Sequence, residues 1–274
     1  MIRDLQEKAR DPTEPPFFIA ADQEGNPVSR FLFLTALTGQ RAIGDEARAF
    51  AIAQKRGEEL RGLGVNINFA PVLDVASSSA DFIFKRAFQG DAAHIAALGA
   101  AMVRGYEEAG IIAVAKHFPG HGGTSVDSHK NLPIVSRNAD ASASALLPFR
   151  AAVKDNVPMV MAGHIKVPEI DALYPASLSS PAIAMVRSGL GFHGVIITDD
   201  MGMGAIRRSY PLPDASVRAV EAGADIVLVV RSFQDYDTIY QAFKVAIVGG
   251  AISEKRINQS VGRILSLKEK YLKD

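Results

Sequence analysis

An acid and a base lie two residues apart in the glycine-rich stretch KHFPGHGGTSVDSHKNLP (116–133), at Asp127 and His129. In an extended segment this spacing puts both side chains on one face. A carboxylate beside an imidazole orients the ring and favours its protonated form. Such a pair can give a proton to a leaving group and then take one from water. The same spacing also fits an Asp that caps a turn beside a solvent-exposed His, and the two residues alone leave both interpretations open.

A second candidate for chemistry is the pair of carboxylates, Asp199 and Asp200, that follows the apolar run VIIT. Neighbouring residues on a strand point to opposite sides, so only one of the two is expected to face a bound substrate. A carboxylate at the end of a strand is suited to act as a nucleophile. The alternative is a pair that caps the N-terminus of the following helix.

Other polar residues lie at strand ends or in loops. Asp22, Gln23 and Glu24 follow an apolar run, and exposed carboxylates there would suit the recognition of hydroxyl groups. Arg86 lies among phenylalanines and is suited to anchor a substrate carbonyl or hydroxyl, or to pair with a surface acid. His164 ends another apolar run, a position that is more often structural than catalytic.

The remaining histidines do not indicate a metal site. His117 and His121 are four residues apart, but the Pro-Gly between them prevents the helix that an i, i+4 zinc pair requires. Lys116 would also oppose a bound cation. His94 lies in a helical pattern, and His193 lies in a glycine-rich approach to a strand.

Six apolar runs alternate with helical patterns, several of which end in glycine, the residue expected just past a helix. The runs are Phe17–Asp22, Asn66–Asp74, Ile111–Phe118, Pro158–His164, Val195–Asp200 and Ala224–Val230. Strands that are apolar along their whole length are buried on both faces, and their alternation with helices predicts a parallel α/β architecture. Ser253–Leu272 is predicted to be a closing helix.

The positions of the polar residues favour a TIM-type (β/α)8-like barrel over an open sheet. Nearly every run ends in polar residues, and barrel enzymes collect their chemistry at the C-terminal ends of many strands. An open doubly wound sheet would concentrate it at one switch point, often with a glycine-rich phosphate loop. No G-x-G-x-x-G follows the first run. Since no linker interrupts the chain, residues 1–274 are predicted to form one domain.

Composition and the distribution of charged and apolar residues argue against several other classes of protein. The chain has 274 residues, and its 30 basic residues balance its 30 acidic ones, so neither nucleic-acid binding nor an acidic solvating role is indicated. Cysteine is absent, which leaves no disulfide framework and no thiolate chemistry. The charged first ten residues contain no secretory signal, and no apolar run is long enough for a membrane helix. A soluble cytoplasmic protein is expected.

Taken together, these segments resemble glycoside hydrolase family 3, and within it the β-N-acetylglucosaminidases of the peptidoglycan-recycling type. The matching segments occur in the family's order over nearly the whole chain. They are ADQEG (21–25), NINFAPVLDV (66–75), KRAF (85–88), KHFPGHG (116–122), DSHKNLP (127–133) and ITDDMGM (197–203). KHFPGHG followed by DSH is the most specific of these features.

The resemblance implies a role for each matching residue. Asp199 would be the nucleophile of a retaining exo-glycosidase, and His129, assisted by Asp127 on a mobile loop, would be the general acid/base. A small carbohydrate, terminal β-linked N-acetylglucosamine on a peptidoglycan fragment, would be the substrate, with no cofactor, metal, nucleic acid or membrane involved. The residues that would bind the sugar are Asp22, Arg86, Lys116, His117 and His164.

Two features depart from the family pattern. The usual Glu-Gly-Gly is Glu24-Gly25-Asn26 here, and Asn also tolerates the positive φ that such a turn needs. Relatives also carry a strand before the helix that matches Met1–Arg10, so an incomplete barrel without its first strand is expected. A mis-assigned start site, an incomplete fold, a rearrangement, or a partner such as a second copy that covers the open edge would account for the gap.

Two other functions stay open at this point. A phosphorylase of the same family would use phosphate in place of water, and a neutral imidazole at His129 would repel phosphate less than a carboxylate does. A non-catalytic glycan-binding relative is the other alternative, although Asp127, His129 and Asp199 are all present.

Overall fold

One curled sheet of parallel strands forms the centre of the protein. The computed structural model describes residues 6, 15–230 and 233–272. Within these residues the strand order is β1-β2-β3-β4-β5, with every neighbouring pair parallel. The strands are β1 (Ala20–Ala21), β2 (Ile67–Asn68), β3 (Ile112–Phe118), β4 (Met159–Ala162) and β5 (Val195–Thr198). This open, curled sheet is the incomplete TIM-type barrel that the sequence predicts.

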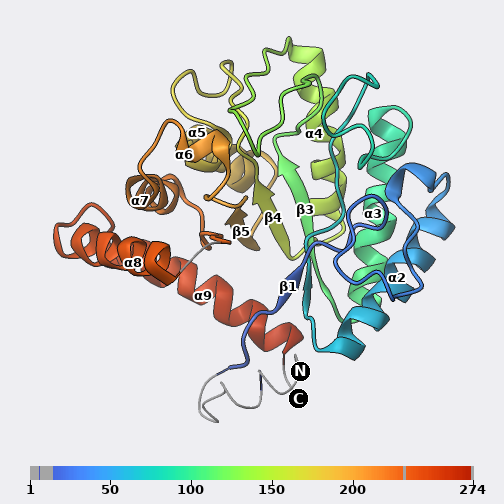
Figure 1. Cartoon of the computed structure of the whole chain (residues 1–274), viewed down its shortest axis with the longest axis horizontal. Helices are drawn as coiled ribbons and strands as arrows, with labels where there is room; N and C mark the ends of the chain where they lie inside the picture. Colours follow the sequence, from blue (N-terminus) through green and yellow to red (C-terminus); the bar gives the residue numbers. More distant parts are fainter. Residues whose placement is uncertain (1–5, 7–14, 231–232, 273–274) are drawn as a thin grey trace.

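Helices surround the sheet, as Figure 1 shows. The α-helices are α2 (Glu46–Leu63), α3 (Ala92–Glu108), α4 (Ala139–Lys154), α5 (Ser180–Ala184), α6 (Gly204–Arg207), α7 (Leu212–Ala222), α8 (Phe233–Val248) and α9 (Glu254–Tyr271). Short 3-10 turns lie at η1 (Gln40–Ala42) and η2 (Ala176–Leu178), and a π-helical turn, η3 (Met185–Gly189), follows α5. The predicted closing helix is confirmed as α9, whereas the helix expected for residues 1–10 lies outside the described residues, apart from Gln6.

The two faces of the sheet pack against different partners. Alternate residues of a strand point to opposite faces. On one face Ala115 and Ile196 belong to the large core shared with the surrounding helices. On the other face Val114 and Ile197 pack with Leu267 of α9. Because both faces are covered, β3, β4 and β5 are buried at every position, which explains why their sequences are continuously apolar.

The sixth predicted strand, 224–230, is wrong as a full strand. This segment runs beside β5 and pairs with it through a single bridge. The backbone N–H of Leu228 donates to the hydroxyl of Thr198, and that of Val230 donates to the Asp200 carboxylate. Side chains at the end of β5 therefore take the place of the backbone ladder, so regular pairing stops.

Glycines end helices and shape the first loop as their left-handed backbone permits. Gly64 (φ 93°) follows α2 and Gly223 (φ 120°) follows α7, in agreement with the predicted helix ends. In the loop after β1, Gly25 has a φ of 89°, and a Cβ there would lie 2.2 Å from the carbonyl oxygen of Thr38. Gly25, rather than Asn26, therefore carries the positive φ of this turn.

Candidate active site

A cavity of about 710 Å³ lies at the C-terminal ends of the strands. The loops that follow β1, β3 and β5 supply most of its polar lining. Six of the predicted site residues line it: Asp22, Arg86, Lys116, His117, His129 and Asp199. The fold thus brings together side chains that are up to 177 positions apart in the chain, counted from Asp22 to Asp199.

Asp199 and Asp200 have different environments. The Asp200 carboxylate accepts hydrogen bonds from the backbone N–H groups of Gly202 (2.9 Å) and Val230 (3.0 Å), so it fixes the turn after β5. Burial raises the pKa of the Asp199 carboxyl, but the neighbouring His117, the backbone N–H of Asp200 and nearby charges outweigh it and lower that pKa. Asp199 is therefore an ionised carboxylate facing the cavity.

A network of four charges, with Glu24 and Lys116 buried at its centre, forms one wall of the cavity. Lys116 Nζ contacts Asp22 Oδ1 at 2.7 Å and Glu24 Oε1 at 2.6 Å. Arg86 donates two hydrogen bonds to Glu24, at 2.7 and 3.0 Å, and its Nη2 lies 3.3 Å from His117 Nε2. The Glu24 side chain is only 3% exposed, so the expectation of an exposed carboxylate at this position is wrong. Glu24 instead holds the two cations in place.

The same network keeps the Asp22 and Lys116 side chains charged. Burial would raise the pKa of Asp22, but the adjacent Lys116 ammonium outweighs it and lowers the pKa to about 2. Burial likewise disfavours a charged Lys116, yet Glu24 and Asp22 raise the pKa of its ammonium group. The wall therefore presents an ionised carboxylate, Asp22, whose side chain is 32% exposed and able to accept hydrogen bonds from a ligand.

Asp74 connects two histidines beneath the cavity. Its fully buried carboxylate accepts a hydrogen bond from His117 Nδ1 at 2.7 Å and from the backbone N–H of His121 at 2.6 Å. Burial would raise the pKa of Asp74, but the His117 ring beside it lowers that pKa to about 2. Sequence reasoning did not place Asp74 in the site, although its position at the end of an apolar run was a usable signal.

The loop that carries Asp127 and His129 is a turn and not an extended segment. The backbone N–H of Lys130 donates to the carbonyl oxygen of Asp127. Asp127 Oδ1 accepts from both the backbone N–H and the Nδ1 of His129, each at 2.9 Å. The two side chains meet as predicted, but through this turn rather than through the same-face spacing of a strand. Asp127 thus caps the turn and orients an imidazole that is 61% exposed, so both of the original interpretations describe part of the geometry.

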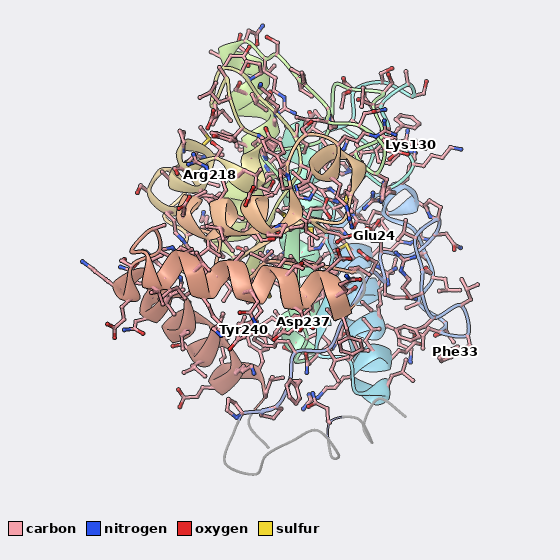
Figure 2. All side chains as sticks on the ribbon, turned by 60° about the vertical axis from the view of Figure 1, so that its left-hand side comes forward. Glu24, Phe33, Lys130, Arg218, Asp237 and Tyr240 are labelled. Carbon is pink, nitrogen blue, oxygen red and sulfur yellow. The ribbon has the colours of Figure 1, made fainter. Side chains whose placement is uncertain are left out.

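Backbone contacts hold this loop against the segment that follows Asp199. The N–H groups of Gly204 and Ala205, at the start of α6, donate to the carbonyl oxygens of His129 (2.9 Å) and Ser128 (3.1 Å). The neighbouring Lys130 projects from the loop into solvent (Figure 2). His129 is thereby held at the cavity although no strand carries it.

His164 and Arg30 both lie near the cavity, but only Arg30 lines it. His164 is buried and donates from Nε2 to the carbonyl oxygen of Asp200 (2.9 Å), while its Nδ1 accepts from the hydroxyl of Ser177 (2.7 Å). Its ring therefore supports the end of β5 and does not line the cavity. Arg30, which sequence reasoning missed, does line it and lies 3.4 Å from Asp22.

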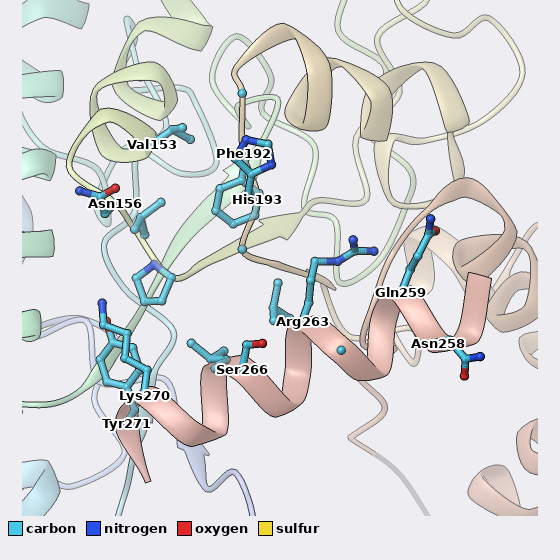
Figure 3. A pocket seen from close by; sticks show the side chains of 17 residues that line it. Val153, Asn156, Phe192, His193, Asn258, Gln259, Arg263, Ser266, Lys270 and Tyr271 are labelled. Carbon is cyan, nitrogen blue, oxygen red and sulfur yellow. The ribbon is translucent and has the colours of Figure 1, made fainter. Parts of the chain in front are cut away.

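A second cavity, of about 610 Å³, lies between α9 and the starts of β4 and β5 (Figure 3). Arg263 and Lys270 line it, but their charges are paired with Asp225 and Glu107. No predicted site residue is among its described lining residues.

Within residues 6, 15–230 and 233–272, no group of three or more His, Asp or Glu is arranged to hold a metal ion. In the same part of the chain no helix combines the length and apolarity needed to cross a bilayer.

Comparison with known sequences identifies relatives over most of the chain. The model of the glycosyl hydrolase family 3 N terminal domain matches residues 1–267. Beta-hexosaminidase LpqI of Mycobacterium tuberculosis is 34% identical over 270 residues, which cover 92% of this chain and 68% of that protein. Beta-hexosaminidase A of Pseudoalteromonas piscicida is also 34% identical, over 93% of this chain. The chain spans 48% of the length of that relative.

A solved structure has the same fold over almost the whole chain. The family 3 β-N-acetylglucosaminidase from Paenibacillus sp. str. FPU-7 superposes with a TM-score of 0.95 at 39% identity. The match covers 98% of this chain and 53% of that one.

Proposed function

The chain belongs to glycosyl hydrolase family 3, and we propose that it is a retaining exo-glycosidase that releases terminal β-linked N-acetylglucosamine. One observation carries the proposal: Asp199 and His129, from separate loops, line the same cavity as the Asp22–Lys116 wall. A carboxylate and a proton donor on opposite sides of a sugar are the requirements for this chemistry. Relatives named beta-hexosaminidase support the same activity.

Asp199 would act as the nucleophile. Its lowered pKa keeps the carboxylate ionised at neutral pH, which nucleophilic attack requires. One oxygen would bond to the anomeric carbon as the bond to the leaving oxygen breaks, so the sugar becomes a covalent glycosyl ester. Water would then break that ester with a second inversion, so the overall configuration is retained.

His129 would move the protons. In the first step it would donate a proton to the leaving oxygen, and in the second it would take one from the attacking water. Asp127 would orient the ring through the hydrogen bond to Nδ1, which leaves Nε2 for this transfer. A histidine that is 61% exposed also exchanges its proton readily with solvent.

The sugar would bind on the wall formed by Asp22, Arg86, Lys116 and His117. Asp22 supplies accepting oxygens for hydroxyl groups, while the buried cations and Asp74 hold that wall rigid. His164 would act behind the cavity by supporting Asp200. The network places Asp22, Lys116 and His117 at strand ends and ties Arg86 to them through Glu24, so these groups move little relative to Asp199.

The substrate we favour is an N-acetylglucosaminyl fragment of peptidoglycan, cleaved by residues 1–274 as a single barrel domain in the cytoplasm. The size of the cavity, about 710 Å³, suits a terminal sugar with part of its aglycone. An oligomer that covers the open edge of the sheet stays a prediction, which light scattering of the purified protein tests.

The activity test uses a chromogenic β-N-acetylglucosaminide with and without phosphate. We expect hydrolysis that phosphate does not accelerate, because a phosphorylase would instead form a sugar phosphate. Asp199→Asn should lower kcat by at least about a thousandfold, since the nucleophile is lost. Asp200→Asn is the matched control and keeps the accepting oxygen of the turn. An inert parent, or a fully active Asp199→Asn variant, would contradict the proposal.

A further inference from the structure

His121 lies between the sugar-binding wall and the loop of His129. His121 is 2% exposed, and its backbone N–H donates to Asp74, the residue that also accepts from His117. The rings of His117 and His121 meet edge to face at 6.1 Å. The backbone of His121 is therefore fixed to the wall, and its side chain is available to contact the loop of His129.

The side chain of His121 contacts the acid/base loop in two ways. Its Nε2 lies 3.1 Å from the hydroxyl of Ser128, the residue between Asp127 and His129. Its ring also packs on Phe82 at 5.3 Å, and the Phe82 ring in turn contacts the ring of His129 at 5.9 Å. The ring of His121 thus contacts the Ser128 side chain directly and the imidazole of His129 through Phe82.

The other ring nitrogen of His121, Nδ1, is buried and has no hydrogen-bond partner among the residues that the structure describes. An unsatisfied buried polar atom destabilises a fold, and a phenylalanine would fill the same space without that cost. Burial lowers the pKa of His121, so the ring is neutral. What the histidine supplies, and a hydrocarbon ring does not, is the hydrogen bond to Ser128.

We propose that His121 is a positioning residue for the acid/base loop: its hydrogen bond to Ser128 and its contact with Phe82 hold His129 over the cavity that contains Asp199. This inference rests on the proposed glycosidase function. His121 acts through Ser128 and His129 and does not itself touch the reacting atoms. The backbone of Ser128 is held separately, by Ala205, so the side-chain bond controls the orientation of the loop rather than its attachment.

Leaving-group dependence separates this role from a structural one. Phenyl β-N-acetylglucosaminide needs a proton on its departing oxygen, whereas the 2,4-dinitrophenyl glycoside leaves as a stable anion and needs none. Because kcat/KM reports the first bond-breaking step, a misplaced His129 slows the phenyl substrate and spares the dinitrophenyl one. A general loss of structure slows both substrates equally.

The experiment compares His121→Phe, Ser128→Ala and the double variant. His121→Phe keeps the packing on Phe82, and Ser128→Ala removes the same hydrogen bond from the other partner with little change in packing. Each single variant should lower kcat/KM for the phenyl glycoside about tenfold and for the dinitrophenyl glycoside less than about twofold. The double variant should be no slower than the slower single variant, because both remove one interaction.

Three results would contradict the positioning role of His121. Equal losses on both substrates, no loss on either, or multiplying losses in the double variant would overturn the positioning role of His121. If His121→Phe fails to fold, Ser128→Ala tests the same bond alone. A parent that cleaves neither glycoside would instead overturn the glycosidase function, which distinguishes that failure from the failure of this inference.

Discussion

The backbone N–H of Gly204 donates to the carbonyl oxygen of His129 at 2.9 Å. This contact joins the acid/base loop to the segment that begins five residues after Asp199, so the two halves of the proposed catalytic pair share one backbone junction. A side chain is excluded there: a Cβ on Gly204 would lie 2.4 Å from the carbonyl oxygen of Lys130 and 2.7 Å from that of His129. The close approach explains why glycine occupies this position.

Gly204→Ala should therefore displace the loop. Because a shift of about 1 Å in a catalytic group can cost up to about a hundredfold, we expect kcat/KM on a chromogenic β-N-acetylglucosaminide to fall at least about tenfold. Gly62→Ala is the matched control, since nothing lies within 4 Å of a Cβ at that position in α2 and alanine favours a helix. A Gly204→Ala enzyme with parental kcat/KM would show that the loop does not need this contact.

Asp127→Asn should separate the charge of Asp127 from its role in the turn. The amide oxygen can still accept the two hydrogen bonds from His129, but the negative charge beside the imidazole is lost. We expect kcat to fall by about tenfold to a hundredfold with little change in KM. Lys130→Ala, on the same exposed turn, should stay within about twofold of the parent. Equal kcat values for Asp127→Asn and the parent would remove the carboxylate from the mechanism.

Glu24→Gln should destabilise the protein because it unbalances the buried wall. Lys116, whose side chain is 1% exposed, would keep only Asp22 as an anionic partner, and Arg86 would lose its carboxylate. Urea unfolding should show a loss of about 3 kcal/mol, the usual result of breaking a buried ion pair from one side. Glu46→Gln removes an exposed pair with Arg104 and should cost less than about 1 kcal/mol. Similar losses of unfolding free energy in the two variants would mean that burial does not make the ion pairs of the wall more important for stability.

Asp74 should make the free energy of unfolding depend on pH in the acid range. Its pKa falls from an ordinary 3.8 to about 2 in the folded protein, so the unfolded chain takes up the proton first as the pH drops. The resulting stabilisation, about 2 kcal/mol, is present above about pH 4 and is lost as the pH falls to 2. The free energy of unfolding, measured with urea at pH 6 and at pH 3, should change less between the two pH values for Asp74→Asn than for the parent. Asp237→Asn, exposed on α8, should behave like the parent, and an unchanged difference in Asp74→Asn would refute this origin.

Much of the fold followed from local patterns. Strands β3, β4 and β5 were predictable because burial on both faces requires an unbroken apolar run. The run 224–230 has the same composition, yet Thr198 and Asp200 occupy its backbone N–H groups. A competition between side chain and backbone for one donor depends on the three-dimensional neighbours, so the sequence alone did not reveal it.

The site was predictable where strand ends carry it and not where loops meet. Lys116 lies near the end of β3 and Asp199 directly follows β5, and their arrival in one cavity follows from parallel topology. The joining of Asp74 to His121 and of Gly204 to His129 depends on how loops from different strands fold over one another. The difference between Asp199 and Asp200 also needed the structure: both line the cavity, but only the folded chain shows that backbone N–H groups hold the Asp200 carboxylate in the turn.

Phe82 is a suitable position for a fluorescent probe of the acid/base loop. Its ring lies between the rings of His121 and His129, and the chain contains no tryptophan. A single indole introduced as Phe82→Trp would be the only such fluorophore in the protein. Its emission would report directly on whether the imidazole of His129 lies beside it, so any movement of the loop would become visible in real time without an added dye.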